Sequence, residues 1–129
     1  MKKKKIFLGL IGLGTVGSRV LRLLYRNKSI VEQKVGAKIE FLYLCDKNKY
    51  RLQENLSGSY SYKGIKRTTS WEKVVYDPQV DIVVELIGGE NPAYEIIIES
   101  LKNNKHVVTA NKLVLANHWG EIFSVAHKK

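Results

Sequence analysis

The stretch that decides the fold is IFLGLIGLGTVGSRVL, residues 6–21. Residues 6–11 form a short apolar run, which predicts a strand buried on both faces of a sheet. Three glycines follow with the spacing Gly12-x-Gly14-x-x-Gly17, and an amphipathic helical pattern begins among them. A buried strand that runs through glycines at this spacing into a helix is typical of dinucleotide-binding βαβ units.

The three glycines have different physical roles in such a turn. Gly12 allows the tight turn, Gly14 lets the backbone approach a pyrophosphate, and Gly17 lets the helix pack closely on the strand. The N–H groups of Thr15, Val16 and Gly17 would point at the phosphates from the positive end of the helix. We therefore predict that this turn binds a dinucleotide; the alternative is a glycine-rich turn without a ligand.

The first residues also resemble a secretory leader, because Lys2–Lys5 precede an apolar run that ends in small residues. The downstream strands disfavour this interpretation. Removal of residues 1–20 would take away the first strand and the glycine turn, and would leave the later motifs without their nucleotide site. The lysines are then expected to be a solvated segment ahead of a buried strand.

Strands and helices alternate along the rest of the chain. Strands are predicted at residues 39–46, 80–89 and 106–110, and helices at residues 15–27, 71–76, 92–103 and 118–129. The first helix is expected to bury Val16, Val20, Leu23 and Leu24. Residues 27–37 are assigned to a loop, and residues 47–69 show no clear pattern. This order predicts an α/β fold, a Rossmann-type doubly wound parallel sheet in a single three-layer domain over residues 1–129.

Asp46 closes the second predicted strand and is the expected partner of the adenosine ribose, whose hydroxyls would donate to its carboxylate. It lies farther along the chain from the glycine motif than the usual interval of about 20 residues. The loop at residues 27–37 absorbs the excess. The alternative is that Asp46 only begins a turn.

The composition is that of an ordinary globular domain, with 44% apolar residues. The formal net charge is +10, but six of these charges come from terminal lysines, Lys2–Lys5, Lys128 and Lys129. Such lysines are usually solvated, so we expect no nucleic-acid partner, and the apolar runs are too short to predict a membrane span. The single cysteine, Cys45, fits a reducing compartment, so a cytoplasmic location is expected.

Three motifs together are specific to one family. IGLGTVGSRVL (residues 11–21), DIVVELIGG (81–89) and HVVTANKLVLANHWGEI (106–122) resemble, in the same order, the nucleotide-binding domain of homoserine dehydrogenase. The resemblance implies hydride transfer between homoserine and aspartate semialdehyde, with NAD or NADP, in the biosynthesis of threonine and methionine. It also implies a homo-oligomer for the full-length protein.

The resemblance assigns roles to particular residues. It places Gly12, Gly14, Thr15, Val16 and Gly17 against the pyrophosphate. It places Ile87 and Gly88 near the nicotinamide ribose, and Lys112 in the active-site cleft, in contact with cofactor or substrate. The alternative for Lys112 is a solvated lysine ahead of a helix.

One departure from the family pattern bears on the cofactor. Many members carry an arginine where this chain has Cys45, and that arginine binds the 2′-phosphate of NADP. A thiol cannot replace a guanidinium, and Asp46 would repel a phosphate, so NAD is favoured. Five cations in nearby loops can restore NADP binding, namely Lys47, Lys49, Lys63, Lys66 and Arg67, so the choice between NAD and NADP stays open.

A second departure is the length. In the family, the acid/base lysine and aspartate, the substrate pocket, a cation site and the dimer interface lie in a following domain, which is expected after residue 129. We therefore expect no catalytic residue and no metal site in this chain, and negligible activity from it alone. The alternative is a non-enzymatic Rossmann module that senses a nucleotide and regulates a partner.

Overall fold

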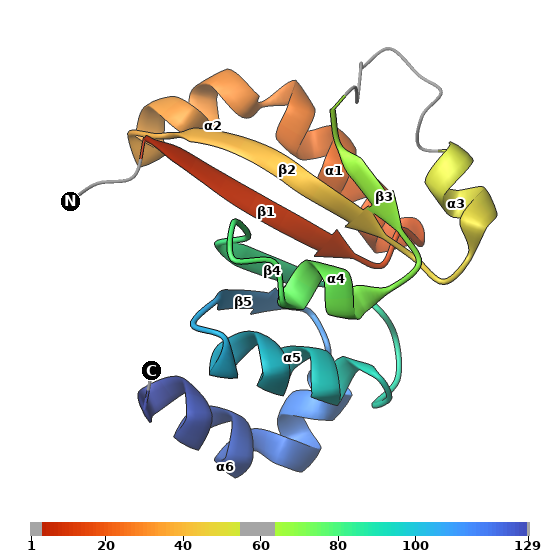
Figure 1. The fold of residues 1–129 in the computed structure, drawn as a ribbon, viewed down its shortest axis with the longest axis vertical. Coiled ribbons are helices and arrows are strands. Elements are labelled where there is room, and N and C mark those ends of the chain that lie inside the picture. Colours follow the sequence, from red (N-terminus) through yellow and green to blue (C-terminus); the bar gives the residue numbers. More distant parts are fainter. Residues whose placement is uncertain (1–3, 55–63, 129) are drawn as a thin grey trace.

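Five parallel strands form one sheet with the order β3-β2-β1-β4-β5 (Figure 1). The computed structural model describes residues 4–54 and 64–128. The strands are β1 (Lys5–Ile11), β2 (Lys38–Cys45), β3 (Lys66–Thr68), β4 (Ile82–Glu85) and β5 (His106–Thr109). The strand order reverses around β1, so the carboxyl ends of β1 and β4 make the topological switch point. The predicted Rossmann-type sheet is confirmed.

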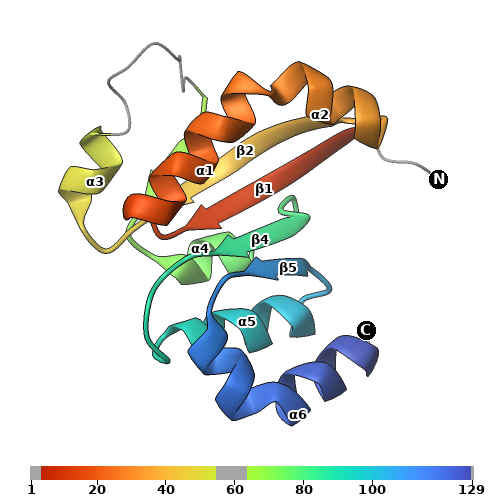
Figure 2. The ribbon, with the colours of Figure 1, turned by 180° about the vertical axis from the view of Figure 1, so that it is seen from behind.

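Helices cover both faces of the sheet. They are α1 (Thr15–Arg26), α2 (Lys28–Val35), α3 (Lys49–Glu54), α4 (Trp71–Val75), α5 (Ala93–Lys102) and α6 (Lys112–Lys128). Helices α1 and α2 lie on one face and α4 and α5 on the other, as the two opposite views show (Figures 1 and 2). Helix α6 packs against α5 through a separate apolar cluster. In the described parts of the chain, no helix is both long and apolar enough to cross a bilayer.

The central strand β1 is buried from both sides, as its unbroken apolar run predicts. Leu10 packs toward α1 in a cluster with Leu21, whereas the adjacent Ile11 packs toward α4 and α5 in a cluster with Ile96. Adjacent strand residues point to opposite faces, so each face of the sheet has its own core. These two cores fix the carboxyl end of β1, where the glycine turn begins.

Helix α1 buries only part of the predicted face: Leu24 packs against the core and Val20 is half-buried, but the other two predicted residues are exposed. Val16 and Leu23 are more than half exposed, whereas Gly17 and Leu21 are buried. Residues four apart lie on one side of a helix, and the side that contains Gly17 is the one that approaches the sheet. The glycine therefore sets the orientation of the helix.

Four elements differ from the sequence prediction: α2, α3 and β3 are additional, and α6 is longer. Residues 28–35 form helix α2 where a loop was expected, and the pattern-free region contains α3 and the short strand β3. Residues 55–63, including Lys63, lie outside the described residues. Helix α6 begins at Lys112 instead of His118, where its backbone leaves helical geometry.

The ends of helix α5 were predicted within a residue. It begins at Ala93, after a cis Asn91–Pro92 bond; the sequence predicts Asn91 as its N-cap, but the N-cap is Pro92, which makes no side-chain capping hydrogen bond. After it, Asn104 has a φ of 62°, the left-handed conformation expected there.

Candidate functional site

The glycine turn lies at the carboxyl end of β1, between β2 and β4. Gly12 donates its N–H to the carbonyl of Cys45 at 2.8 Å and has a φ of 105°. A Cβ on Gly12 would lie 2.8 Å from the carbonyl carbon of Leu86. Both its conformation and its contact with the chain after β4 therefore require glycine.

The other two glycines face very different surroundings. A Cβ on Gly17 would lie 1.7 Å from the carbonyl oxygen of Gly12, so no side chain fits where α1 meets the turn. Gly14 has φ −72° and ψ −156°, an extended conformation open to any residue. Among the described residues outside its own chain neighbours, only the Nη1 atom of Arg51, at 3.6 Å, lies near a Cβ built there. Space is thus left at Gly14 that the protein does not fill.

The first turn of helix α1 presents backbone donors to this space. Helix α1 begins at Thr15, and its first helical hydrogen bond runs from the Ser18 N–H to the Gly14 carbonyl at 2.9 Å. The N–H groups ahead of Ser18 have no acceptor within the helix. Together with the helix dipole, they suit an anion such as a pyrophosphate.

Asp46 joins the glycine turn to the end of β2. Its carboxylate accepts the Leu13 N–H at 2.7 Å and the Asn48 N–H at 2.8 Å, and its side chain is only 6% exposed. The carboxylate therefore fixes the turn from the side, in addition to the ribose contact that stays a prediction. Helix α2 accounts for the additional residues between Gly17 and Asp46 in the sequence, and it lies away from the carboxyl edge of the sheet (Figure 1).

Arg51 is a residue of this site that sequence reasoning missed. Its Nη1 atom lies 3.5 Å from Oδ2 of Asp46 and beside the space at Gly14, and half of the side chain is exposed. Of the loop cations predicted from the sequence, Lys47 lines a hollow that Arg51 also lines, whereas Lys66 lies over the ring of Tyr43. No motif contains Arg51, because helix α3, which positions it, has no recognisable pattern.

Two hollows flank the glycine turn along the carboxyl edge of the sheet. The β2-side hollow, about 240 Å³, is lined by residues that include Gly12, Asp46, Arg51, Trp71 and Ile87. The β5-side hollow, about 420 Å³, is lined by Val16, Leu86, Ile87, Gly88, Ala110, Asn111, Lys112 and Leu113. Ile87 lines both, so the two hollows meet beside the turn. All the predicted site residues therefore lie along one edge of the sheet.

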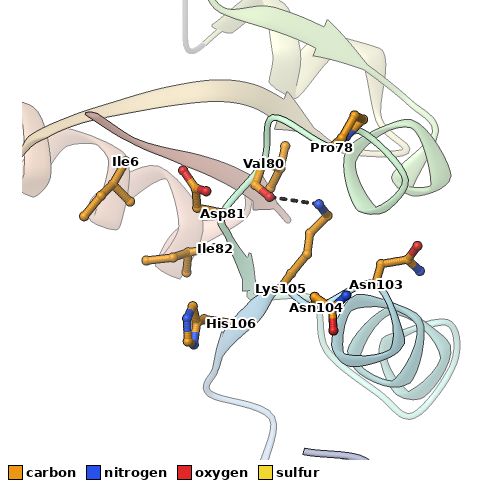
Figure 3. Close-up of a pocket in the computed structure, with 9 residues that line it drawn as sticks. All are labelled: Ile6, Pro78, Val80, Asp81, Ile82, Asn103, Asn104, Lys105 and His106. Atoms are coloured by element: carbon orange, nitrogen blue, oxygen red, sulfur yellow. Dashed lines mark hydrogen bonds between the residues drawn. The ribbon is translucent and has the colours of Figure 1, made fainter. Parts of the chain in front are cut away.

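A third hollow lies at the opposite, amino edge of the sheet (Figure 3). It has a volume of about 450 Å³ and contains Asp81 and Lys105, but none of the predicted site residues. Its charged groups serve the fold. Lys105 donates to the carbonyls of Asp77 and Val80, each at 2.8 Å, and Asp81 accepts the Phe7 N–H at 2.9 Å.

Lys112 is the first residue of α6 and is exposed. Only Ala110 and Asn111 separate β5 from α6, so the lysine stands at the carboxyl edge of the sheet, where it lines the β5-side hollow together with Ile87 and Gly88. An ammonium there can bind a hydroxyl, a phosphate or a carboxylate that enters this hollow. The position agrees with the predicted cleft contact, whose chemistry stays a prediction.

Glu85 is a buried carboxyl at the end of β4, with no exposed surface. Burial raises its pKa, against the hydrogen bonds it accepts from the Thr109 hydroxyl at 2.5 Å and the Ile87 N–H at 2.8 Å. Sequence reasoning gave it no role. The available signal was a charged residue inside an apolar strand, because a buried carboxyl needs partners.

Cys45 is a buried thiol and serves packing. It is 2% exposed, and burial, with smaller contributions from the charges of Asp46 and Glu72, raises its pKa to about 12. Since the thiolate is the reactive form, we expect iodoacetamide at pH 8 to leave the folded chain unmodified and to add one adduct in urea, as mass spectrometry would measure. Rapid modification of the folded chain would contradict this burial.

Comparison with known proteins identifies the family. The family model for the NAD-binding domain of homoserine dehydrogenase matches residues 12–129. The chain belongs to the homoserine dehydrogenase family. The resemblance drawn from the three motifs is confirmed, and the NAD-binding domain carries the glycine turn and both flanking hollows.

Similar homoserine dehydrogenases occur in several bacteria. The enzyme of Methylobacillus glycogenes is 39% identical over 88% of this chain, and that of Pseudomonas aeruginosa is 36% identical over 98%. A crystal structure of homoserine dehydrogenase from Thiobacillus denitrificans aligns over 97% of the chain with a TM-score of 0.87 and 40% identity. This NAD-binding domain spans 26–28% of the length of these three proteins.

Proposed function

We propose that the chain holds NAD or NADP across the carboxyl edge of its sheet, for hydride transfer between homoserine and aspartate semialdehyde. The observation that supports this most directly is the unfilled space at Gly14, in front of the free N–H groups of α1 and between two hollows that meet at Ile87. An extended ligand with a central anionic group suits this arrangement. A dinucleotide has that form, with a base and a ribose on either side of a pyrophosphate.

Each half of the cofactor has a proposed place. The backbone from Gly12 to Gly17, with Thr15 and Val16, would hold the pyrophosphate. Asp46 would accept from the adenosine ribose in the β2-side hollow. In the β5-side hollow, Ile87 and Gly88 would contact the nicotinamide ribose, and Lys112 would contact the cofactor or the substrate. The bound nicotinamide would supply the hydride acceptor or donor; these residues would bind and orient it.

The remaining steps are proposed to depend on residues outside this chain. The chain spans about a quarter of the length of the relatives that it matches. Groups that hold homoserine and move its proton, a cation site and the contacts of a homo-oligomer are proposed for the rest of such a protein. A cytoplasmic enzyme of threonine and methionine biosynthesis, whose partner is a dinucleotide and not a nucleic acid, fits this proposal.

A calorimetric titration of the chain with NADH and NADPH tests the proposal. We expect both to bind, and NADH more tightly, because the carboxylate of Asp46 would repel a 2′-phosphate. A preference for NADPH would show that Arg51 and the neighbouring lysines outweigh Asp46. Absence of binding by both dinucleotides would overturn the proposed function for this chain.

A further inference from the structure

We infer that Asn111 is a positioning residue: its side-chain amide holds residues 87–89, here called the 87–89 loop, in the conformation that receives the nicotinamide half of the cofactor. This inference rests on the proposed function, because it assigns the β5-side hollow to that half. Asn111 lies between β5 and α6 and is buried.

The amide of Asn111 bonds both the 87–89 loop and the start of α6. Its Nδ2 donates to the carbonyl oxygens of Ile87 at 3.1 Å and Gly89 at 2.7 Å. Its Oδ1 accepts the Val114 N–H at 3.0 Å, within the first turn of α6. One side chain therefore ties the 87–89 loop to the start of α6.

Glu85 and Thr109 complete the same network from the ends of β4 and β5. The carboxyl of Glu85 accepts the Ile87 N–H and the Thr109 hydroxyl. The oxygen of that hydroxyl in turn accepts the Asn111 N–H at 3.0 Å. Ile87 is thus held at its N–H by Glu85 and at its carbonyl by Asn111.

Ile87 packs against two apolar clusters, but the two glycines of the 87–89 loop have little packing. Apart from the chain neighbours of each glycine, no atom of the described residues lies within 4 Å of a Cβ built on Gly88 or on Gly89, and Gly89 has a φ of 81°. Two successive glycines in open space have wide conformational freedom. The donors and acceptors of Asn111 and Glu85 restrict this freedom.

The network joins two segments that line the β5-side hollow. Ile87 and Gly88 belong to the first segment, and Asn111 and Lys112 to the second. The amide of Asn111 fixes one segment relative to the other, because it bonds both the loop carbonyls and the first turn of α6. Its loss would affect the β5-side hollow directly, and the β2-side hollow only at Ile87, which lines both.

The substitution Asn111→Asp tests this inference. An aspartate keeps the oxygen that caps α6 and is favourable at a helix N-terminus, but it places an acceptor against the carbonyls of Ile87 and Gly89. We expect calorimetry to show NADH affinity at least about tenfold weaker. ADP, which has the adenosine and both phosphates but no nicotinamide, should keep its affinity within about twofold.

Asn103→Asp is the matched control. Asn103 also donates its Nδ2 to a carbonyl, that of Glu99 at 2.7 Å, but it lies at the amino edge of the sheet (Figure 3). We expect it to bind both ligands as the unaltered chain does. Unchanged NADH affinity in Asn111→Asp, or an equal loss for NADH and ADP in a folded variant, would overturn the inference.

If Asn111→Asp does not melt cooperatively, Thr109→Val tests the same inference. It removes the hydroxyl that links Glu85 to the Asn111 N–H. The same selective loss of NADH affinity is expected, and equal affinities for the variant and the unaltered chain would overturn the inference. Failure of the unaltered chain to bind either ligand would instead overturn the proposed function.

Discussion

Replacing Gly14 by valine is expected to abolish dinucleotide binding while the chain stays folded. The extended backbone at Gly14 accepts any residue, and a Cβ there meets only the flexible end of Arg51. The added methyl groups would occupy the space in front of the α1 N–H groups, where the pyrophosphate is proposed to lie. We expect NADH affinity to fall by about a hundredfold, or about 2.8 kcal/mol.

The measurement for Gly14→Val is an NADH titration beside a thermal melt. Gly120→Val is its control, because Gly120 lies on α6 and, apart from its chain neighbours and the backbone of its own helix, no described atom lies within 4 Å of an added Cβ. Both variants should melt close to the unaltered chain, and only Gly14→Val should lose binding. Tight NADH binding by folded Gly14→Val would show that the pyrophosphate lies elsewhere.

Replacing Gly17 by alanine is expected to destabilise the fold itself. Its Cβ would lie 1.7 Å from the carbonyl oxygen of Gly12, and this atom belongs to the backbone of the turn. Relief of the clash requires α1 to move away from the sheet, which would open the core around Leu21. We expect the free energy of unfolding to fall by about 3 kcal/mol or more.

Urea and thermal unfolding measure the effect of Gly17→Ala. For a chain of 129 residues, a loss of this size lowers Tm by roughly 10 °C. Gly120→Ala is the matched change on α6 and should leave Tm unchanged or raise it, because alanine favours a helix interior. A Tm for Gly17→Ala equal to that of the unaltered chain would contradict the close contact between α1 and Gly12.

The sequence was sufficient for the parts of the fold whose causes are local. The apolar run of β1, the positive φ of Gly12 and the left-handed Asn104 each depend on a residue and its chain neighbours. The Rossmann-type order followed from the alternation of such segments. The same holds for the glycine turn, whose residues are contiguous.

The remaining parts depend on contacts between distant segments. Strand β3 has the polar sequence Lys-Arg-Thr, and it is a strand because its backbone pairs with Tyr43–Cys45 of β2. Helix α2 is polar and buries none of its residues, so it lacks the apolar stripe by which helices are recognised. The face of α1 was misassigned in part, at Val16 and Leu23, because Gly17, which is not apolar, marks its closest approach to the sheet.

The residues of the candidate site also fall into a group that the sequence predicts and a group that it does not. Asp46 was found because it ends a strand after the motif, whereas Arg51 reaches the turn only through the placement of α3. The network of Glu85, Thr109 and Asn111 joins residues 24 positions apart, which become neighbours when β4 pairs with β5. Patterns in sequence identify residues that act through local geometry, but not those that act through such pairing.

The surroundings of the three glycines also determine which of them indicates phosphate binding. Gly12 and Gly17 are required by backbone conformation and close packing, so a protein that had lost its cofactor would still need them to fold. Of the three, only Gly14 lies where neither the backbone conformation nor the packing of the protein requires a glycine. In related folds of unknown activity, a side chain at this middle position would therefore indicate a turn that no longer receives a phosphate, even where the outer two glycines persist.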